Sequence, residues 1–319
     1  MTSPAAYAGS RLAVIGPGAL GTLFAARLAL AGVPTLLLDY RTDRALALNE
    51  RGIRLITRDG ETLVPAPVTA DPRNLAQVDA ALVLVKAYQT EQAALTLAEH
   101  LPPQGIAITL QNGLGNLEAL TLALGEARAF GGTTAQGAIL EAPGVVRDTG
   151  QGPTVLGHAG GEADHRLDDV AQALLLAGFS VSITRTIHAA IWTKAILNAA
   201  INPVAALTRL RNGPLAEQES SLALMTAAAR EAAHVARAHG ITIEEQDWRA
   251  RLHALCAATA PNINSMLRDV LGQRRTEIDA INGAIVRTAE LHGLATPVNR
   301  TLWYLIGTIE QRYGAQVAR

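Results

Sequence analysis

One short stretch of the chain combines an ammonium group with carboxamides on an otherwise apolar background. Lys194, Asn198 and Asn202 follow one another at intervals of four residues, and most of their neighbours are Ala, Ile or Leu. On an α-helix this spacing places the three side chains on one narrow face. A lysine on such a face either extends to water or is held in a pocket. A lysine held in a pocket can be tuned to release a proton, so the stretch indicates acid–base chemistry.

The use of lysine in the chain favours the pocket. Lys86 and Lys194 are the only lysines among the 319 residues, whereas arginines occur throughout. Where a surface position needs only positive charge, this sequence places arginine. Arginine stays protonated in proteins, so a position that keeps lysine requires a property that arginine lacks. We therefore predict that Lys194 transfers a proton.

A glycine-rich turn near the N-terminus predicts dinucleotide binding. An apolar run over residues 11–15 leads into the turn, a helix-forming segment follows it, and residues 33–38 form a second apolar run. In such a unit the first glycine allows the turn, the second lets backbone approach a pyrophosphate, and the third permits close helix–strand packing. The helix N-terminus offers N–H groups to the phosphates. A strand–turn–helix without a ligand is the alternative. The cofactor-binding positions expected in the turn are Gly16, Pro17, Gly18, Ala19, Leu20 and Gly21.

The residues after the second run leave the choice of cofactor open. Asp39 can bind a ribose 2′-hydroxyl and repel a 2′-phosphate, which favours NAD. Arg41 and Arg44 follow closely and can receive a 2′-phosphate, which favours NADP. The third interpretation is that Asp39 only caps the next helix.

Three further positions lie where predicted strands end. Lys86 follows a buried apolar run over residues 79–85, and Asn112 follows another over residues 106–110. Ligands of doubly wound sheets bind outside the carboxyl ends of the strands. A solvated loop lysine and an ordinary Asn-Gly turn are the alternatives. Residues 130–138 are predicted as one small-residue strand, ending at Ala138, whose glycines permit close approach of a ligand.

Beyond residue 188 the pattern is helical. Helices are predicted over residues 222–238, 248–258 and 276–292. Thr276 and Asp279 have the spacing of a capping box, which would start the last of these helices and place Glu277 in its first turn. The functional alternative is that Glu277 points into a cleft with Ser265 opposite.

The length and the pattern indicate two domains. We expect an α/β Rossmann-like dinucleotide-binding domain over residues 1–185, followed by an all-α domain over residues 186–319 that binds substrate. Apolar residues make up 49% of the chain and aromatic residues only 3%, as suits parallel strands and closely packed helices. The net charge of −1, without a basic block, argues against a nucleic-acid partner.

Other classes of protein are disfavoured by what the sequence lacks. The single cysteine, Cys256, excludes an intramolecular disulfide framework, and its apolar surroundings indicate a packed thiol. The histidines show no spacing that would recommend a metal site. The first ten residues carry no signal-peptide pattern, and no uninterrupted apolar run reaches membrane-spanning length. We therefore expect a soluble cytoplasmic protein without a membrane partner.

Taken together, these motifs resemble the ketopantoate reductase (2-dehydropantoate 2-reductase) family over nearly the whole chain. The lysine–asparagine helix is the more specific signal when it is combined with Ser265-Met-Leu and Thr276-Glu-Ile-Asp. The resemblance implies an N-terminal Rossmann domain, a helical domain and an active site in the cleft between them. It implies reduction of 2-dehydropantoate to (R)-pantoate with NAD(P)H, for pantothenate and coenzyme A synthesis, and no metal.

The resemblance also assigns roles to individual residues. Lys194 matches the catalytic general acid, and Glu277 matches an acid near both the lysine and the cofactor. Asn112 matches a residue at the junction of nicotinamide and substrate, while Lys86 and Ala138 match cofactor contacts. The remaining matches are to substrate-binding positions, namely Asn198, Asn202, Asn212 and Ser265.

The chain departs from the family pattern after the second strand. The family commonly places an arginine there for the NADP 2′-phosphate, whereas this chain has Asp39-Tyr40-Arg41. NADPH is therefore the expected cofactor, with NADH as an open alternative. The substrate alternatives are another branched 2-oxo acid on the same frame or, in a different class, a nucleotide-binding sensor without chemistry. The alanine-rich helical faces of the second domain could pair in a homodimer.

Overall fold

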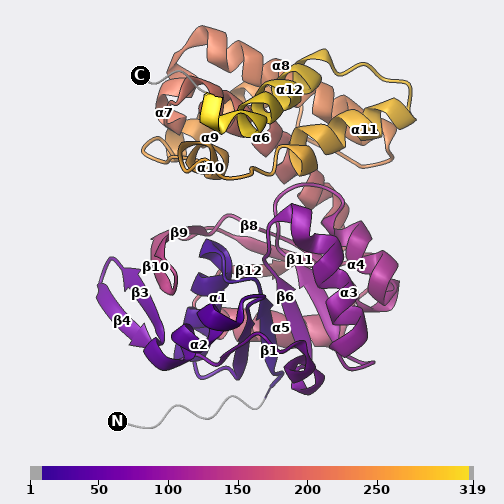
Figure 1. The fold of residues 1–319 in the computed structure, drawn as a ribbon. Coiled ribbons are helices and arrows are strands. Elements are labelled where there is room, and N and C mark those ends of the chain that lie inside the picture. Colours follow the sequence, from indigo (N-terminus) through magenta and orange to yellow (C-terminus); the bar gives the residue numbers. More distant parts are fainter. Residues whose placement is uncertain (1–8, 316–319) are drawn as a thin grey trace. The chain divides into compact units, whose positions relative to one another are not determined.

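Residues 9–315 of the protein are described by a computed structural model, and they form two units (Figure 1). The first unit consists of the chain up to Gln111 together with Asn116–Ala190. The second unit, called here the helical unit, consists of Asn112–Gly115 together with the chain from Ile191 onward. The short segment after Gln111 therefore groups with the helical unit, although it connects two elements of the first.

An eight-stranded sheet forms the centre of the first unit, as the alternating pattern of apolar runs and helices predicts. Its strand order is β12-β11-β8-β7-β6-β1-β2-β5, and all neighbouring strands are parallel except β8 and β11. The strands are β1 (Leu12–Ile15), β2 (Thr35–Leu38), β5 (Val68–Thr69), β6 (Ala80–Val83), β7 (Ile106–Thr109), β8 (Ala129–Thr134), β11 (Thr154–His158) and β12 (Val181–Ile183).

The order of the strands reverses at β1. The chain runs outward from β1 through β2 to β5 on one side, and through β6, β7 and β8 on the other. Such a switch point leaves a crevice at the carboxyl ends of the two central strands, where doubly wound proteins bind their ligands. The predicted Rossmann-like fold is thus confirmed.

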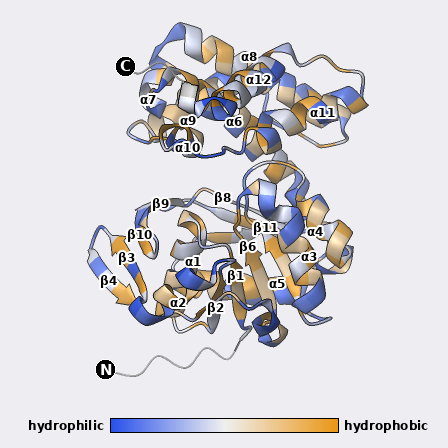
Figure 2. Cartoon of the chain, in the orientation of Figure 1, coloured by the Kyte–Doolittle hydropathy of each residue, from blue (hydrophilic) through white to orange (hydrophobic). Residues whose placement is uncertain are grey.

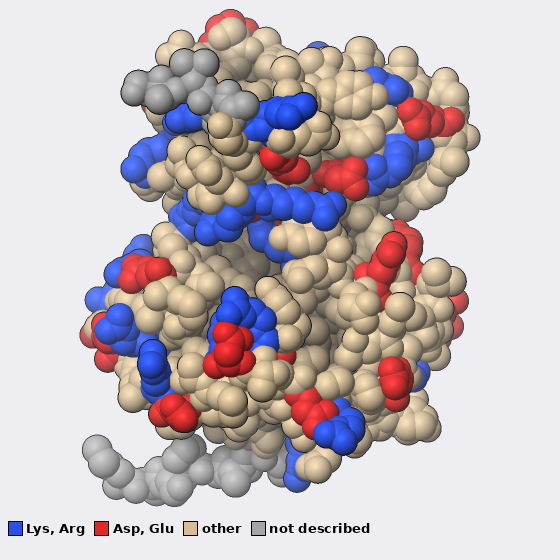
Figure 3. All heavy atoms as spheres, in the orientation of Figure 1, with Lys and Arg blue, Asp and Glu red and all other residues tan. Residues whose placement is uncertain are grey.

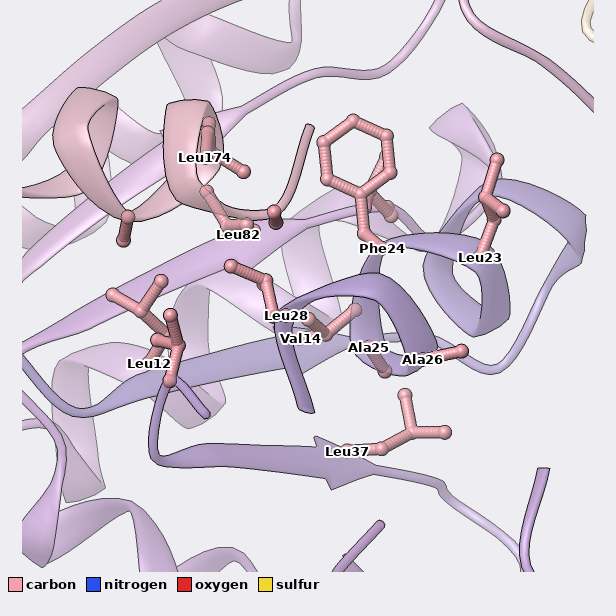
Figure 4. Close-up of a cluster of buried hydrophobic side chains, with 14 of the residues drawn as sticks. Leu12, Val14, Leu23, Phe24, Ala25, Ala26, Leu28, Leu37, Leu82 and Leu174 are labelled. Carbon is pink, nitrogen blue, oxygen red and sulfur yellow. The ribbon is translucent and has the colours of Figure 1, made fainter. Parts of the chain in front are cut away.

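Helices flank this sheet (Figure 1). They are α1 (Ala19–Leu30), α2 (Thr42–Arg51), α3 (Thr90–His100), α4 (Asn116–Leu124) and α5 (His165–Leu176), with short 3-10 turns η1 (Pro72–Gln77), η2 (Ala87–Gln89) and η3 (Glu126–Arg128). Alternate strand residues such as Leu12, Val14 and Leu82 are buried against Phe24 of α1 and Leu174 of α5, as Figure 4 shows. Their period of two is that of a strand presenting one face to a helical layer.

A second sheet departs from the predicted strand pattern. Residues 130–138 form two strands rather than one, because β9 (Gly137–Ala142) leaves the main sheet after β8 and pairs with β10 (Val145–Gly150). β4 (Gly60–Val64) and β5 belong to different sheets, since Pro65 and Pro67 between them interrupt strand pairing. β10 also pairs with β3 (Ile53–Thr57), so the order of the second sheet is β4-β3-β10-β9.

The helical unit is built from helices, as the pattern beyond residue 188 predicts. They are α6 (Ile187–Thr208), which starts at the end of the first unit, α7 (Asn212–Glu217), α8 (Glu219–Ala238), α9 (Trp248–Ala258), α10 (Ser265–Leu271), α11 (Ala284–Leu291) and α12 (Pro297–Gln311), with a π-helical turn η4 (Asp279–Gly283) and a 3-10 turn η5 (Tyr313–Ala315). Their apolar faces form a second core, built largely from alanine, and Figure 2 shows hydrophobic and hydrophilic residues alternating along these helices.

Helix α6 is the most apolar of these. Within the described chain it is the one helix long and apolar enough to cross a membrane. However, 61% of its most apolar 18-residue stretch is buried inside the protein. Lys194, Asn198 and Asn202 also interrupt its apolar surface. Both features are those of a core helix.

The predicted capping box at Thr276 and Asp279 is wrong. The hydroxyl of Thr276 accepts a hydrogen bond from Ile278 N, and Thr276 N donates to Glu310 on α12 at 2.7 Å. Asp279 pairs instead with Arg287 at 3.0 Å. The helix therefore begins at Asp279 with the π-helical turn η4, and Glu277 precedes it.

Candidate active site

The glycine-rich turn is folded as its sequence predicts. Gly16 has φ +105°, and a β-carbon there would lie 2.9 Å from Val85 N at the end of β6. A β-carbon on Gly21 would lie 1.9 Å from the carbonyl oxygen of Gly16. Both glycines are therefore required by the turn and by the packing of α1 on β1.

The middle glycine is different, because the fold alone does not require it. Gly18 is exposed, has an extended backbone (φ −70°), and a β-carbon there would approach nothing closer than 3.9 Å. It is also the N-cap of α1 and provides no side chain to the first-turn N–H groups, and that turn has no acidic residue. Open space above uncapped amides suits a pyrophosphate, so the turn fits a dinucleotide.

Asp39 at the end of β2 is engaged by its neighbours. Its side chain is fully buried, and Oδ1 accepts hydrogen bonds from Arg41 N at 2.9 Å and from Arg44 Nη2 at 2.6 Å. Oδ2 pairs with Arg44 Nε. The guanidinium of Arg44 stacks over Tyr40 at 5.1 Å, and the carboxylate raises its pKa. The negative charge of Asp39 is thus compensated inside the protein.

Arg41 has a different partner. Its Nε donates to Asp43 Oδ1 at 3.1 Å, and both side chains are more than half exposed. Figure 3 shows basic and acidic side chains side by side on the drawn face of the first unit. An exposed ion pair of this kind contributes little and can rearrange.

Lys86 stands at the expected edge of the sheet. It follows β6 and is the N-cap of η2. The neighbouring strand ends are tied together by Gln111, whose Nε2 donates to Val85 O at 2.9 Å and to Thr90 Oγ1 at 2.7 Å. Gln111 has no role in the prediction from the sequence. A polar residue directly after a buried strand is the feature of the sequence that could have indicated one.

Ala138 lies on β9, opposite Asp148 of β10. It is partly buried and packs against the core of the first unit. The expected cofactor contacts in this unit are the six residues of the glycine turn together with Asp39, Arg41, Lys86 and Ala138.

The helical unit brings Lys194 and Glu277 together. Lys194 is partly buried on α6, and Glu277 is 8% exposed just before η4. Burial lowers the pKa of Lys194 from 10.5 to about 8, while the negative charge of Glu277 acts to raise it. An ammonium with a pKa near neutrality is protonated at pH 7 and can still release its proton.

The two carboxamides on α6, Asn198 and Asn202, have no hydrogen-bond partner in the described part of the chain. Asn202 is only 5% exposed. Asn198 is partly buried, and neither amide has a competing partner among the described residues, so both are suited to a polar ligand.

Asn212 begins α7 and is bonded to the loop that follows α9, and Ser265 begins α10 at the end of that loop. Asn212 Nδ2 donates to Thr259 Oγ1 at 2.9 Å, and its N–H donates to Asn262 O at 3.1 Å. The Oδ1 of Asn212 is buried without a partner in the described part of the chain. Ser265 is exposed at the start of α10.

Asn112 belongs to the short segment that groups with the helical unit. Its neighbour Gly113 has φ +91°, and a β-carbon there would lie 2.7 Å from Ala280 O. Leu114 N donates to the same carbonyl at 2.8 Å. The segment therefore packs on η4, three residues beyond Glu277.

Metal sites and reactive cysteines are two further kinds of site that the residue types of a chain can form. Within residues 9–315, no three histidine, cysteine or acidic side chains form a group that could hold a metal ion. Cys256 is buried, and burial raises the pKa of its thiol to about 11. The prediction of a packed thiol is confirmed.

The sequence matches two family descriptions. Residues 12–161 match "Ketopantoate reductase PanE/ApbA", and residues 186–310 match "Ketopantoate reductase PanE/ApbA C terminal". The 2-dehydropantoate 2-reductase of Halobacterium salinarum is 36% identical over 95% of this chain and 100% of its own length.

Solved structures give the same fold. A PanE/ApbA family ketopantoate reductase from Ralstonia eutropha is 30% identical, with a TM-score of 0.86 over 95% of this chain and 99% of its own. A D-mandelate dehydrogenase bound to NADH and anilino(oxo)acetate is 24% identical, with a TM-score of 0.87 over 96% of this chain and 100% of its own. On these matches, the chain belongs to the ketopantoate reductase family, whose members are oxidoreductases.

Proposed function

We propose that this enzyme reduces 2-dehydropantoate to (R)-pantoate, the step that supplies pantoate for pantothenate and coenzyme A synthesis. One observation carries the proposal most directly. A lysine whose pKa is lowered to about 8 shares a helix face with two carboxamides that lack partners among the described residues. The relatives that match over nearly the whole chain are 2-dehydropantoate 2-reductases.

Lys194 is the general acid of this mechanism. When bound, the nicotinamide cofactor would supply the hydride that the keto carbon receives. As negative charge develops on the keto oxygen, the ammonium of Lys194 stabilises it and donates a proton, so the products are the hydroxyl group and a neutral amine. Glu277 favours the protonated lysine before the reaction, because its charge raises the pKa of that group.

The carboxamides hold the rest of the substrate. Asn198 and Asn202 lie one and two turns beyond Lys194, within reach of the carboxylate and the hydroxyl of a small 2-oxo acid. Asn112, Asn212 and Ser265 complete the proposed substrate-binding set. Partners of this kind give specificity, because an analogue that lacks the hydroxyl leaves a buried amide unpaired.

The glycine turn, Lys86 and Ala138 hold the cofactor in this proposal, with Asn112 and Glu277 at its nicotinamide end. We assign NADPH as the preferred form and NADH as an accepted one. Arg44 neutralises Asp39, so the carboxylate repels a 2′-phosphate less than its sequence position suggests. Arg41 is exposed and only weakly held by Asp43, so it can turn to a 2′-phosphate.

The decisive assay follows cofactor oxidation with 2-dehydropantoate beside a panel of 2-oxo acids, with NADPH and with NADH. We expect the highest kcat/KM for 2-dehydropantoate with NADPH. Lys194→Ala should bind the cofactor normally but lose turnover by about 100-fold or more. Near-normal turnover in that variant would remove the general-acid role, and silence on every substrate would favour a sensor.

A second candidate is reduction of another branched 2-oxo acid on the same frame. The same fold is found in a D-mandelate dehydrogenase. A larger kcat/KM for such an acid than for 2-dehydropantoate would decide in its favour.

The division of labour follows the units. Residues 1–185 bind the cofactor in this proposal, residues 186–319 bind the substrate, and the enzyme works in the cytoplasm. A homodimer through the helical unit is the proposed assembly.

A further inference from the structure

Helix α6 contains a proline in its interior. Pro203 lies five residues before the end of the helix and one residue after Asn202. A proline has no N–H, so it cannot donate to the carbonyl four residues earlier, and its ring pushes that carbonyl outward. The carbonyl concerned belongs to Ala199, which stands between Asn198 and Asn202.

A side chain from another element supplies the missing donor. Asn282, within the π-helical turn η4, donates from Nδ2 to Ala199 O at 3.0 Å. Asn282 is completely buried, so this bond lies away from bulk water. A hydrogen bond to a buried carbonyl is costly to lose, because the oxygen loses the side-chain donor that stands in for the missing backbone N–H.

Asn282 is itself fixed by a buried polar chain. The same Nδ2 donates to Asn299 Oδ1 on α12 at 3.0 Å, and Asn299 Nδ2 donates to Ala228 O at 3.0 Å and to Glu231 Oε2 at 2.9 Å on α8. Glu231 also accepts from Asn299 N at 3.0 Å in the first turn of α12. The donor to α6 is thus positioned by two further helices.

The Oδ1 of Asn282 shows that this residue is present for its N–H groups. That oxygen is buried and has no hydrogen-bond partner among the described residues. An apolar side chain would avoid the unpaired oxygen, but it would leave the Ala199 carbonyl unpaired instead. The amide therefore serves the carbonyl on α6.

From these contacts we infer that Asn282 is a positioning residue for the reaction, replacing the N–H that Pro203 lacks. The bond holds α6 at the turn between Asn198 and Asn202, where Pro203 removes the helical hydrogen bond, and so keeps Asn202 aligned with Lys194. This inference rests on the proposed substrate-binding role of the two asparagines.

The test is a double-variant cycle on residues 282 and 203. Asn282→Ala should raise KM for 2-dehydropantoate about 10-fold, with a smaller effect on kcat, and should leave the dissociation constant of NADPH unchanged. Pro203→Ala restores an N–H at that position, which can donate to Ala199 O. In the double variant the KM should therefore return to within about 3-fold of the wild-type value.

A matched control separates alignment from general stability. Ser221→Ala removes another buried hydrogen bond of the helical unit, from Ser221 Oγ to Leu215 O at 2.6 Å, and leaves the Asn282 chain intact. We expect it to lower Tm while KM stays within about 2-fold of wild type. An equal rise in KM for Ser221→Ala would contradict a local effect at Ala199.

The remaining outcomes are equally decisive. If Asn282→Ala folds and KM is unchanged, or if Pro203→Ala does not rescue it, the inference is overturned. If Asn282→Ala fails to fold, a folded and active double variant supports the inference, and a double variant that also fails overturns it. Failure of the proposed function would appear separately, as an inactive wild-type enzyme on 2-dehydropantoate.

Discussion

At the scale of single residues, the chemistry depends on the balance between burial and charge at Lys194. Burial lowers the pKa of its ammonium to about 8, and the carboxylate of Glu277 opposes that shift. The two influences leave a group that is mostly protonated at pH 7 yet is a much better acid than a lysine in water.

This balance predicts the pH dependence of the reaction. A general acid must be protonated to act, so kcat/KM should be constant at lower pH and fall as the pH rises through about 8. Glu277→Gln removes the charge that raises this pKa, so the fall should move to lower pH. The measurement is kcat/KM from pH 6 to 10.

A matched variant checks the assignment. Lys194→Arg keeps the positive charge but holds its proton throughout this range, so it should lose at least about 100-fold in kcat and show no fall near pH 8. A fall that persists in Lys194→Arg would assign the titration to another group.

The choice between NADPH and NADH is also decided by single residues. Arg41 and Asp43 form an exposed pair, so either can be removed with little effect on stability. Arg41→Ala should lower kcat/KM for NADPH about 10-fold and leave NADH unchanged. Asp43→Ala should increase the preference for NADPH, because it releases Arg41. Equal changes for both cofactors in the two variants would exclude contact with the 2′-phosphate.

At the scale of elements, the turn between β1 and α1 separates the demands of folding from those of binding. The three glycines of the turn have different surroundings. Gly16 and Gly21 are enclosed by backbone, whereas Gly18 faces open space.

The difference predicts opposite phenotypes for the same substitution. Gly18→Ala should keep the wild-type Tm to within about 2 °C but raise KM for the cofactor about 10-fold, because its methyl group occupies the space above the α1 N-terminus. Gly21→Ala should lower Tm strongly or prevent folding, because its β-carbon would lie 1.9 Å from Gly16 O. Thermal melts and cofactor titrations measure both. A large loss of stability in Gly18→Ala would contradict the assignment.

Elements governed by local sequence could be predicted without the structure. The glycine turn, the buried parallel strands and the polar face of α6 each follow from a period or a turn signal within a few residues. The candidate residues Lys194, Asn198 and Asn202 were found in this way.

Features that depend on distant partners could not be predicted. The predicted strand over residues 130–138 is divided because β9 forms its backbone hydrogen bonds with β10 instead of with a strand of the main sheet. The capping box fails because Glu310, 34 residues away, takes the N–H of Thr276. The engagement of Asp39 by Arg44, and of Ala199 by Asn282, likewise requires side-chain geometry that no local pattern encodes.

At the scale of the whole molecule, the two units have separate cores. The buried residues of the first unit and those of the helical unit form distinct hydrophobic clusters. The three tryptophans of the chain, Trp192, Trp248 and Trp303, all belong to the helical unit. Tryptophan fluorescence therefore reports on only one of the two cores.

This distribution predicts how the cofactor affects unfolding. NADPH binds mainly to the first unit in our proposal, so at about 100 times its Kd it should stabilise that unit by about 2.7 kcal/mol. Calorimetry should show a transition that shifts upward with NADPH, and the tryptophan-detected transition should shift less. Identical shifts in both measurements would indicate that the two cores unfold together.

The single thiol of the chain makes the opening of the helical core measurable. Cys256 is completely buried, and burial raises its pKa to about 11, so a thiol reagent cannot reach a reactive thiolate while the core is closed. With no second cysteine in the chain, one label per molecule records each opening. The labelling rate in native buffer, compared with that of a free thiol, then gives the free energy of opening of this core alone. Repeating the measurement with substrate would show how much ligand binding tightens it.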